Sequence, residues 1–388
     1  MKKVNSTKYL SCFIIIILKK ITELTKGQKS FFKVCTKPLL NQVNLWNHHL
    51  PNIQPHYAVK CNNDEYLLTN LAKAKVNFDC ASYGEIKQIL DLGINQNRII
   101  YANPYKSASD IEYAISKNIP ITVVDSVEEL EKLRNKNIEI LIRVKVNDKD
   151  SLMPFSSKFG ASYEEIIDIL NLAKKYNMNI SGFSFHVGSG CYNSNQYYEA
   201  VKTIYDIMIN TKNLNHNYKI IDIGGGFSGE DDEKFIDQAS KINEALKLFS
   251  TPSNMNILSG LKFISEPGRY FMTKTHTLYT PIIAKRKTGN KIFYIIDESL
   301  YSSFSNITYD MAKPTLDLVS PPKIDADTKY HDSTIFGRTC DSADKIMEMK
   351  LPELQIGDYF EVKNMGAYTT ASSTNFNGFA TTEKIYLC

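Results

Sequence analysis

YEEIIDILNLAKKYNMNISGFSFHV, residues 163–187, joins an amphipathic stretch to a short apolar run, and this pairing decides the fold. Tyr163–Tyr176 carries a broad apolar face, with Glu and Lys elsewhere; its members are Ile166, Ile167, Ile169, Leu170, Leu172 and Ala173. Such spacing predicts an amphipathic helix. The run Ser181–Val187 that follows is typical of a strand buried on both faces. The stretch therefore predicts one helix–strand unit of a parallel sheet.

The same alternation continues on both sides of this unit, from about residue 36 to residue 272. Eight candidate strands can be marked: His56–Lys60, Asn77–Ala81, Arg98–Ala102, Pro120–Asp125, Glu139–Val144, Ser181–Val187, Tyr218–Gly224 and Leu261–Glu266. Parallel strands of this number, with helices between them, match an α/β (β/α)8 TIM barrel. A doubly wound open sheet is the alternative, but it usually has fewer strands.

After Tyr270 the long helical patterns stop. Short β-rich runs appear among Pro, Gly and Asp turns: Thr277–Ala284, Lys291–Ile296, Tyr359–Val362 and Lys384–Leu387. We therefore expect three parts: a barrel over 36–272, a mostly β C-terminal domain over 273–388, and an N-terminal segment, 1–35, that joins the β domain. The apolar run Leu10–Leu18 in that segment is too short to span a bilayer, and we interpret it as a buried strand.

Composition argues against several classes of function. The chain has 388 residues, 43% of them hydrophobic and 23% charged, as in an ordinary globular protein large enough for two domains. A net charge of +4 without clustering predicts neither nucleic-acid nor membrane binding. Seven scattered cysteines without a C-x-x-C pair, and no H-E-x-x-H, predict no metal site and no disulfide framework. A reducing, cytoplasmic compartment is expected.

Chemistry is expected at the carboxyl ends of the strands, where barrels of this type build their active sites. Those ends carry Lys60, Asp79, Arg143, His186, Gly224–Gly226 and Glu266. Lys60 ends the apolar strand HYAVK, where a buried charge is costly unless the amine forms a Schiff base with a carbonyl cofactor. The alternative for Lys60 is a lysine that emerges from the barrel mouth into water.

Two loops have the character of a cofactor site. The run Asp222–Gly229 follows a strand and precedes a helical stretch, so its N–H groups suit a phosphate at a helix N-terminus; a tight turn is the alternative. It lacks G-x-G-x-x-G spacing, which argues against NAD. In Ser265–Tyr270, Glu266 could hold a pyridinium nitrogen and Arg269 a phosphate, or the two could form a structural ion pair. His186 could stack on a flat ring, or it could be a core histidine. Together, the lysine, the glycine run, the carboxylate, the arginine and the histidine describe a pyridoxal-phosphate site.

Eight motifs resemble the eukaryotic-type ornithine decarboxylases, within the alanine-racemase-like, fold-type III pyridoxal-phosphate enzymes. They are Tyr57–Asn62 (YAVKCN), Phe78–Ser82 (FDCAS), Phe185–Gly190 (FHVGSG), Asp222–Phe227 (DIGGGF), Glu266–Tyr270 (EPGRY), Thr339–Ser342 (TCDS), Met365–Tyr368 (MGAY) and Phe376–Phe379 (FNGF). The resemblance runs from about Phe31 to the C-terminus. It implies a barrel joined to a β domain, a homodimer with shared active sites, and conversion of L-ornithine to putrescine and CO2.

The resemblance also implies a role for each matching residue. Lys60 would form the Schiff base with pyridoxal 5'-phosphate, His186 would stack on its ring, and Glu266 would pair with its nitrogen. Phosphate binding would fall to Ser189, Gly226, Gly268, Arg269 and Tyr368, and support of the lysine and ring to Asp79, Glu85, Arg143 and Lys158.

The partner subunit would supply the substrate side of each site. Cys340 would protonate the carbanion left after CO2 departs, and Asp310 and Asp341 would hold the distal ammonium. Tyr309 and Phe376 would complete the substrate pocket. In arginine-specific relatives the acid matching Asp310 is longer or displaced, so the short side chain here favours ornithine.

Three positions depart from the family pattern. Arg338 stands where Pro is usual, Asp297–Ser299 (DES) where Asn-Asp-Gly is common, and Met311 where His is usual. We expect these changes to alter affinity or the dimer interface without removing a catalytic group. The alternatives are a lysine, arginine or diaminopimelate decarboxylase, a non-catalytic antizyme-inhibitor-like binding protein, and alanine racemase. The retained site residues argue against the inhibitor, and the Cys340 motif argues against the racemase.

Overall fold

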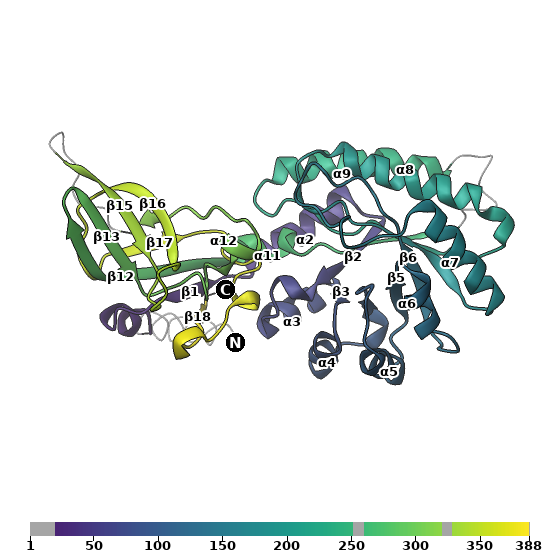
Figure 1. Cartoon of the computed structure of the whole chain (residues 1–388), viewed down its shortest axis with the longest axis horizontal. Helices are drawn as coiled ribbons and strands as arrows, with labels where there is room; N and C mark the ends of the chain where they lie inside the picture. The colour runs from purple at the N-terminus through teal and green to yellow at the C-terminus, as the bar shows by residue number, and fades with distance from the viewer. Residues whose placement is uncertain (1–19, 251–259, 320–327, 388) are drawn as a thin grey trace, which may run out of the picture. The chain divides into compact units, whose positions relative to one another are not determined.

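The computed structural model describes residues 20–250, 260–319 and 328–387, which form two compact units (Figure 1). One unit is Leu39–Met272, and the other runs from Thr273 onward together with the segment up to Pro38. The run Leu10–Leu18, predicted to be a strand, lies outside the described residues.

The unit Leu39–Met272 contains a closed barrel of parallel strands. In chain order they are β2 (Ile53–Ala58), β3 (Asn77–Cys80), β4 (Ile99–Tyr101), β5 (Ile121–Val124), β6 (Glu139–Arg143), β8 (Ile180–Ser184), β10 (Ile220–Asp222) and β11 (Lys262–Ser265). The ring closes where β11 pairs with β2, Phe263 opposite Ile53. All eight predicted strands are confirmed. The open-sheet alternative is excluded, because an open sheet has no pairing between its first and last strands.

Helices and one two-stranded sheet complete this unit. The helices are α2 (Lys37–His49), α3 (Glu65–Lys73), α4 (Tyr83–Asp91), α5 (Ala108–Ser116), α6 (Val127–Lys132), α7 (Tyr163–Lys175), α8 (Asn195–Asn210), α9 (Asp232–Leu246) and α11 (Arg269–Met272). The strands β7 (Ser151–Met153) and β9 (Ser189–Cys191) pair antiparallel in a separate two-stranded sheet. The predicted helix over 163–176 is α7, and a reciprocal capping box between Ser162 and Glu165 starts it.

The buried stripe of α7 is narrower than the sequence predicted. Ile166, Ile169, Leu170 and Ala173 are buried. Ile167 and Leu172 are partly exposed. At 100° per residue these two lie at the edges of the apolar face, so the packed surface does not reach them.

Two apolar clusters position the loops of the barrel unit. Side chains from five strands fill its interior: Ile100, Val123, Leu141, Ile220 and Ile264. Outside it, Trp46 of α2 packs against four rings, those of Phe227, Phe235, Tyr270 and Phe271, with centroids 5.1–6.1 Å away. The Trp46 indole N–H also donates to the Ile53 carbonyl at 2.9 Å. This cluster fixes the loop after β10 and the helix α11.

The second unit is mostly β. Its strands are β1 (Phe31–Val34), β12 (His276–Thr288), β13 (Lys291–Ile296), β14 (Asp317–Leu318), β15 (Tyr330–Phe336), β16 (Lys345–Pro352), β17 (Tyr359–Val362) and β18 (Glu383–Tyr386), with the short helix α12 (Ser305–Tyr309) between β13 and β14. The N-terminal strand β1 pairs antiparallel with β12 and parallel with β18.

Cysteine pairing differs from the expectation at one place. Cys61, Cys80, Cys191 and Cys340 are free. Cys35, which directly follows β1, is disulfide-bonded. Sequence spacing did not indicate this bond, because a disulfide requires closeness in space rather than along the chain.

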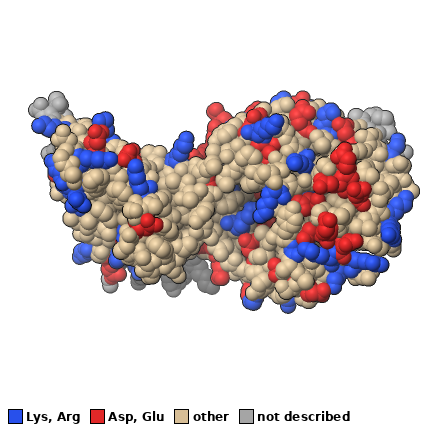
Figure 2. Space-filling model, in the orientation of Figure 1, with Lys and Arg blue, Asp and Glu red and all other residues tan. Residues whose placement is uncertain are grey.

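On the face shown in Figure 2, Lys and Arg are interspersed with Asp and Glu. Neither sign covers the face alone. Within the described ranges, no helix is both long enough and apolar enough to cross a membrane.

Substitution of Gly182 in β8 is a test of how closely neighbouring strands of the barrel pack. A Cβ at this position would collide with the backbone carbonyl of Ile220 in the neighbouring strand β10. We expect Gly182→Ala to destabilise the protein by about 1–3 kcal/mol, since well-packed backbone cannot move aside. Thermal unfolding followed by circular dichroism measures this.

Gly84→Ala is the matched control. Gly84 lies in the first turn of α4, and the nearest atom to an added Cβ there is 3.7 Å away. We expect it to leave stability unchanged or to raise it by up to about 1 kcal/mol. Equal melting temperatures for the two variants would contradict the packing argument.

Candidate active site

Lys60 lies just beyond β2, in the single 3-10 turn Val59–Cys61. Val59 and Cys61 are fully buried and anchor the turn, whereas Lys60 is exposed. The interpretation of Lys60 as a buried strand-end charge is therefore wrong. The turn ends the strand two residues early and leaves the lysine exposed, as in the alternative that the sequence left open.

Three carboxyl groups gather at the neighbouring strand ends. Asp79 ends β3, Asp222 ends β10, and Glu266 follows β11. Burial, followed by the charge of Glu266, raises the pKa of Asp79 well above its usual value. Burial, followed by the charge of Asp222, raises the pKa of Glu266 in the same way. Burial raises the pKa of Asp222 to about 6.

The raised pKa of Glu266 and its charge interaction with Asp222 mark the two carboxyl groups as an interacting pair. One oxygen of Asp222, Oδ1, accepts the Gly224 N–H at 2.9 Å. The other, Oδ2, is buried and has no donor among the described side chains, which a protonated Glu266 would provide. The positive charge of Lys60 opposes the shifts by lowering the pKa of both Asp79 and Glu266, so these groups lie within electrostatic reach of one another.

Two further charged groups belong to the same rim. Arg143 ends β6, and its guanidinium lies 4.6 Å from the centre of the Phe159 ring, which Lys158 also approaches, at 5.0 Å. Glu85, in the first turn of α4, accepts the Ala81 N–H at 2.6 Å. Burial raises the pKa of Glu85, and Lys60 lowers it.

His186 follows β8, and its imidazole is neutral. The Gly188 N–H donates to Nδ1 at 3.0 Å, which leaves the ring proton on Nε2. Burial lowers the pKa of His186 well below its usual value, and the charges of Arg143 and Lys60 add to this. The His186 ring can take this position because residue 225 is glycine. A Cβ there would crowd Nε2 at a distance of 3.0 Å.

The loops that carry Ser189, Gly226 and Arg269 are tied together. The Arg269 guanidinium donates to Ser189 Oγ at 2.7 Å, and the Cys191 N–H donates to the Gly226 carbonyl at 3.1 Å. Gly226 has φ +105, and a Cβ there would lie 2.5 Å from the Gly188 carbonyl oxygen. Gly268 is buried directly before Arg269.

The predicted helix N-terminus at the glycine run is wrong. Helix α9 begins at Asp232, after the N-cap Asp231, and its first turn carries Asp232 and Glu233. Those carboxylates would repel a phosphate from the helix end. The cation that can meet a phosphate beside Gly226 is Arg269.

In the β domain, Tyr301 contacts two predicted residues, Asp341 and Phe376. Its hydroxyl donates to Asp341, and its ring stacks on Phe376 with centroids 4.2 Å apart. This hydrogen bond, together with the Ala343 N–H, holds the pKa of Asp341 below its usual value. The Cys340 thiol is exposed, and the Cys340 N–H donates to Asn377 Oδ1 at 2.9 Å.

A second group in this domain surrounds α12. Asp310 is buried at the end of this helix, and Tyr309 is 64% exposed. The Ser305 hydroxyl donates to the Thr369 carbonyl at 3.2 Å, which places the helix beside Tyr368. Tyr368 has a left-handed φ of +54. The hydrogen bond to Asp341 is the main cause of the raised pKa of Tyr301, and the smaller contribution of Tyr309 indicates that the two groups lie within electrostatic reach of each other.

Sequence reasoning assigned no role to Asp222, Tyr301 and Asn377. Asp222 had a usable signal, since an acid directly before a glycine run at a strand end lies on the rim of the barrel. Tyr301 and Asn377 gave no such signal, because their contacts with Asp341 and Cys340 join segments about 40 residues apart.

The barrel rim fits a flat, nitrogen-containing ring that carries a phosphate. The buried Asp222 oxygen and Glu266 supply a carboxyl pair that can hold a protonated ring nitrogen. The imidazole of His186 adds no positive charge against that ring. Arg269 and Ser189 supply donors for the phosphate, and Lys60 supplies an exposed amine.

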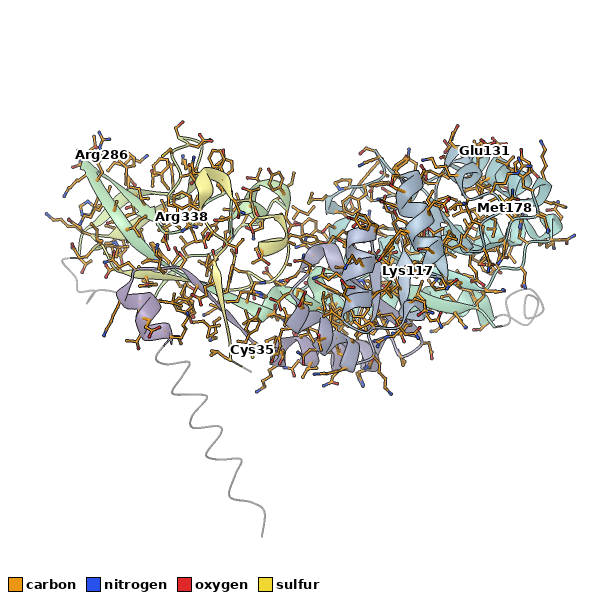
Figure 3. All side chains as sticks on the ribbon, turned by 90° about the horizontal axis from the view of Figure 1, so that it is seen from below. Cys35, Lys117, Glu131, Met178, Arg286 and Arg338 are labelled. Atoms are coloured by element: carbon orange, nitrogen blue, oxygen red, sulfur yellow. The ribbon has the colours of Figure 1, made fainter. Side chains whose placement is uncertain are left out.

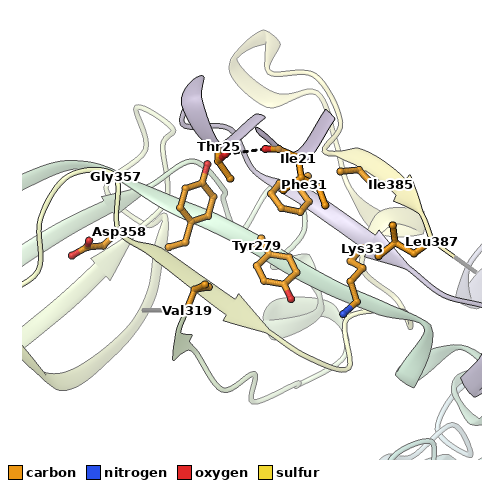
Figure 4. Close-up of a pocket in the computed structure, with 11 residues that line it drawn as sticks. Ile21, Thr25, Phe31, Lys33, Tyr279, Val319, Gly357, Asp358, Ile385 and Leu387 are labelled. Carbon is orange, nitrogen blue, oxygen red and sulfur yellow. Dashed lines mark hydrogen bonds between the residues drawn. The ribbon is translucent and has the colours of Figure 1, made fainter. Parts of the chain in front are cut away.

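A separate cavity of about 370 Å³ lies in the β domain (Figure 4). It is lined mainly by apolar side chains, including Ile21, Phe31, Tyr279, Val319 and Leu387. None of the predicted site residues lines it.

Comparison with known proteins identifies the family. Residues 37–273 match the model described as pyridoxal-dependent decarboxylase, pyridoxal binding domain. A probable ornithine decarboxylase of Dictyostelium discoideum is 38% identical over 90% of this chain and 77% of its own. Antizyme inhibitor 2 of Xenopus laevis is 36% identical over 85% of this chain and 75% of its own.

A solved structure agrees over the length of the chain. The arginine decarboxylase of Paramecium bursaria Chlorella virus, bound to agmatine, superposes with a TM-score of 0.86 at 35% identity. That likeness covers 92% of this chain and 97% of the viral one. With its closed parallel barrel, its mostly β second unit and this matched domain, the chain belongs to the pyridoxal-dependent decarboxylase family.

Proposed function

We propose that this protein decarboxylates L-ornithine to putrescine and CO2, with pyridoxal 5'-phosphate as its cofactor. The observation that carries the proposal is the barrel rim, where Lys60, Asp79, Glu266, Arg143 and His186 lie within electrostatic reach of one another. The Dictyostelium relative, named a probable ornithine decarboxylase, supports the choice of substrate.

Pyridoxal phosphate, when bound, supplies an electron sink for the negative charge left on Cα as CO2 departs. The chain's own residues would prepare that sink. The Lys60 amine would hold the cofactor covalently, and Glu266 would keep the ring nitrogen protonated with Asp222 behind it. Because His186 is neutral, it can lie against the ring without repelling a pyridinium. Ser189, Gly226, Gly268, Arg269 and Tyr368 would bind the phosphate, and Asp79, Glu85, Arg143 and Lys158 would support the lysine and ring.

The β domain would act on the substrate. Cys340 carries an exposed thiol, which would return a proton to Cα after the C–C bond breaks. Asp310 and Asp341 would hold the distal ammonium, beside Tyr309 and Phe376. We propose that these residues come from the partner subunit of a homodimer, so that each active site is shared.

The organisation of the chain follows this division of roles. Residues 36–272 would bind the cofactor, and 273–388 with 1–35 would supply the substrate side. We propose a cytoplasmic location, which the free thiols of Cys61, Cys80, Cys191 and Cys340 support, whereas the disulfide at Cys35 argues the other way.

The likeness to antizyme inhibitor 2 of Xenopus laevis favours one other function, that of a non-catalytic binding protein. Lys60, His186, Arg269 and Cys340 are all retained, which supports the enzyme instead. Incubating the purified protein and pyridoxal phosphate with each basic amino acid, and identifying any amine released, separates the two functions.

Lys60 is expected to be the attachment site of the cofactor. Borohydride reduction of the loaded protein should fix the cofactor to the peptide that contains Lys60, as read by mass spectrometry. Lys60→Ala should lose the label, because no other amine would be placed to react. The exposed Lys117, at the C-terminal end of α5 and labelled in Figure 3, serves as control, and Lys117→Ala should keep the label. Label on a different lysine would reject the assignment.

Shared sites can be tested by subunit exchange. Lys60→Ala and Cys340→Ala should each be nearly inactive alone. Mixing them in equal amounts should restore about a quarter of wild-type activity, since half of the dimers are hybrids with one intact site each. If exchange is verified by differently tagged subunits and no activity returns, the two residues do not share a site.

Asp310 is expected to select the substrate. A distal ammonium without its carboxylate partner is costly to bury, so Asp310→Ala should raise KM for ornithine by roughly tenfold or more. Wild-type protein should still turn over lysine weakly, because one methylene typically contributes only about 1–3 kcal/mol of discrimination. Asp317→Ala, at an exposed acid of β14, is the control. Unchanged ornithine kinetics in Asp310→Ala would remove this role, and preference of the wild type for lysine or arginine would overturn the substrate.

A further inference from the structure

Arg338, labelled in Figure 3, connects its own segment of the β domain to two others that are distant along the chain. Its Nη1 pairs with Asp297 Oδ1 at 2.9 Å, at the end of β13. Its Nη2 donates to the Ala380 carbonyl at 3.3 Å, and its guanidinium lies 4.4 Å from the centre of the Phe379 ring. The Arg338 backbone N–H donates to the Glu298 carbonyl at 2.9 Å.

The Arg338–Asp297 pair is well shielded from water. The side chains are 11% and 7% exposed, respectively. Asp297 is held from its other side too, because Oδ2 accepts the Ser30 N–H at 2.8 Å. Arg338 is not fully satisfied, since its buried Nε has no partner. A buried pair with an unpartnered donor contributes little net stability, but it can specify one arrangement of the segments around it.

The segments that Arg338 joins carry Cys340 and Phe376. The first includes Cys340, two residues after Arg338, and the second is the exposed stretch from Phe376 to Ala380. The link between them nearest the thiol is the Cys340 N–H donating to Asn377 Oδ1 at 2.9 Å. Because Asn377 lies in an exposed turn with φ +54, its position depends on how that turn is anchored. The contacts of Phe379 and Ala380 with the Arg338 guanidinium provide such an anchor.

The other side of the Cys340 loop is anchored separately. Asp344 Oδ2 accepts the Thr339 hydroxyl at 2.7 Å and the Thr339 N–H at 3.1 Å. That anchor fixes the loop to its own strand, but it does not reach the Phe376–Ala380 turn. The turn is tied to the loop by Asn377 and Arg338, and also through Tyr301, whose hydroxyl donates to Asp341 and whose ring stacks on Phe376.

We propose that Arg338, held by Asp297, is a positioning residue that fixes the Cys340 loop and the Phe376–Ala380 turn against each other. Its role is to hold the thiol in one place while a proton is delivered to the substrate. This inference rests on the proposed function of Cys340 and concerns the same site.

The first measurement is hydrogen exchange on the enzyme saturated with pyridoxal phosphate. In Arg338→Gln, exchange at the Cys340 amide and in residues 376–380 should be about tenfold faster or more, since local opening no longer breaks an ion pair. Asp297→Asn should act in the same direction, and Arg338→Lys should be intermediate, because lysine keeps the charge but not the planar fork.

The second measurement is product partition with ornithine. Misplacement of the thiol should divert several-fold more turnover to decarboxylation-dependent transamination, which yields an aldehyde and pyridoxamine phosphate in place of putrescine. A smaller folded fraction lowers the rate but leaves this ratio unchanged, so the ratio separates positioning from loss of stability. Lys285→Gln removes a different ion pair of the same domain, Lys285–Glu353 at 2.8 Å, and should change neither readout.

Each outcome is decisive. Faster exchange with a shifted product ratio supports the proposal. Unchanged exchange in Arg338→Gln and Asp297→Asn overturns the clamp, and faster exchange with clean putrescine overturns its role in positioning. If these variants fail to fold, Phe379→Leu, which removes only the ring beneath the guanidinium, carries the same test. Failure of the proposed function is seen separately, as clean putrescine at wild-type rate from Cys340→Ala itself.

Discussion

Buried negative charge at the carboxyl rim of the barrel is the constraint on which the candidate site depends. Asp79, Asp222 and Glu266 come from three strand ends that ring closure places together. Burial, followed by the repulsion between these carboxyl groups, raises all three pKa values. The positive charges of Lys60 and Arg143 oppose this for Asp79 and Glu266. A protonated ring nitrogen brought against Glu266 would relieve the same repulsion, which is why the rim suits a pyridinium.

The glycines make that arrangement of charge possible. Gly225 and Gly226 let the loop after β10 approach His186 and Gly188 more closely than side chains would allow. The aromatic cluster around Trp46 holds this loop and α11 from outside. The positions of Ser189, Gly226 and Arg269 thus follow from backbone packing, whereas the protonation of Glu266 follows from burial.

The β domain presents its polar groups differently. Its groups lie on loops between strands, so each depends on contacts between segments distant along the chain. Tyr301 bonds Asp341 and stacks on Phe376, and Asn377 accepts the Cys340 N–H. Two departures from the family pattern, Arg338 and Asp297, meet as a buried ion pair beside these loops. The sequence could name both departures, but only folding shows that they contact each other.

The sequence by itself determined the barrel, the mostly β second unit and most of the rim residues. Strand periodicity and chain order suffice there, because parallel strands in a closed barrel must bring their carboxyl ends to one rim. Local backbone geometry could not be read from the sequence. Lys60 is exposed in a turn whose other two residues are buried, and α9 begins too late to meet the glycine run. Tertiary structure alone decided the disulfide at Cys35, the electrostatic interaction of Asp222 with Glu266, and the contacts of Tyr301 and Arg338. These depend on distance and burial between segments far apart in the chain, which no local pattern of residues encodes.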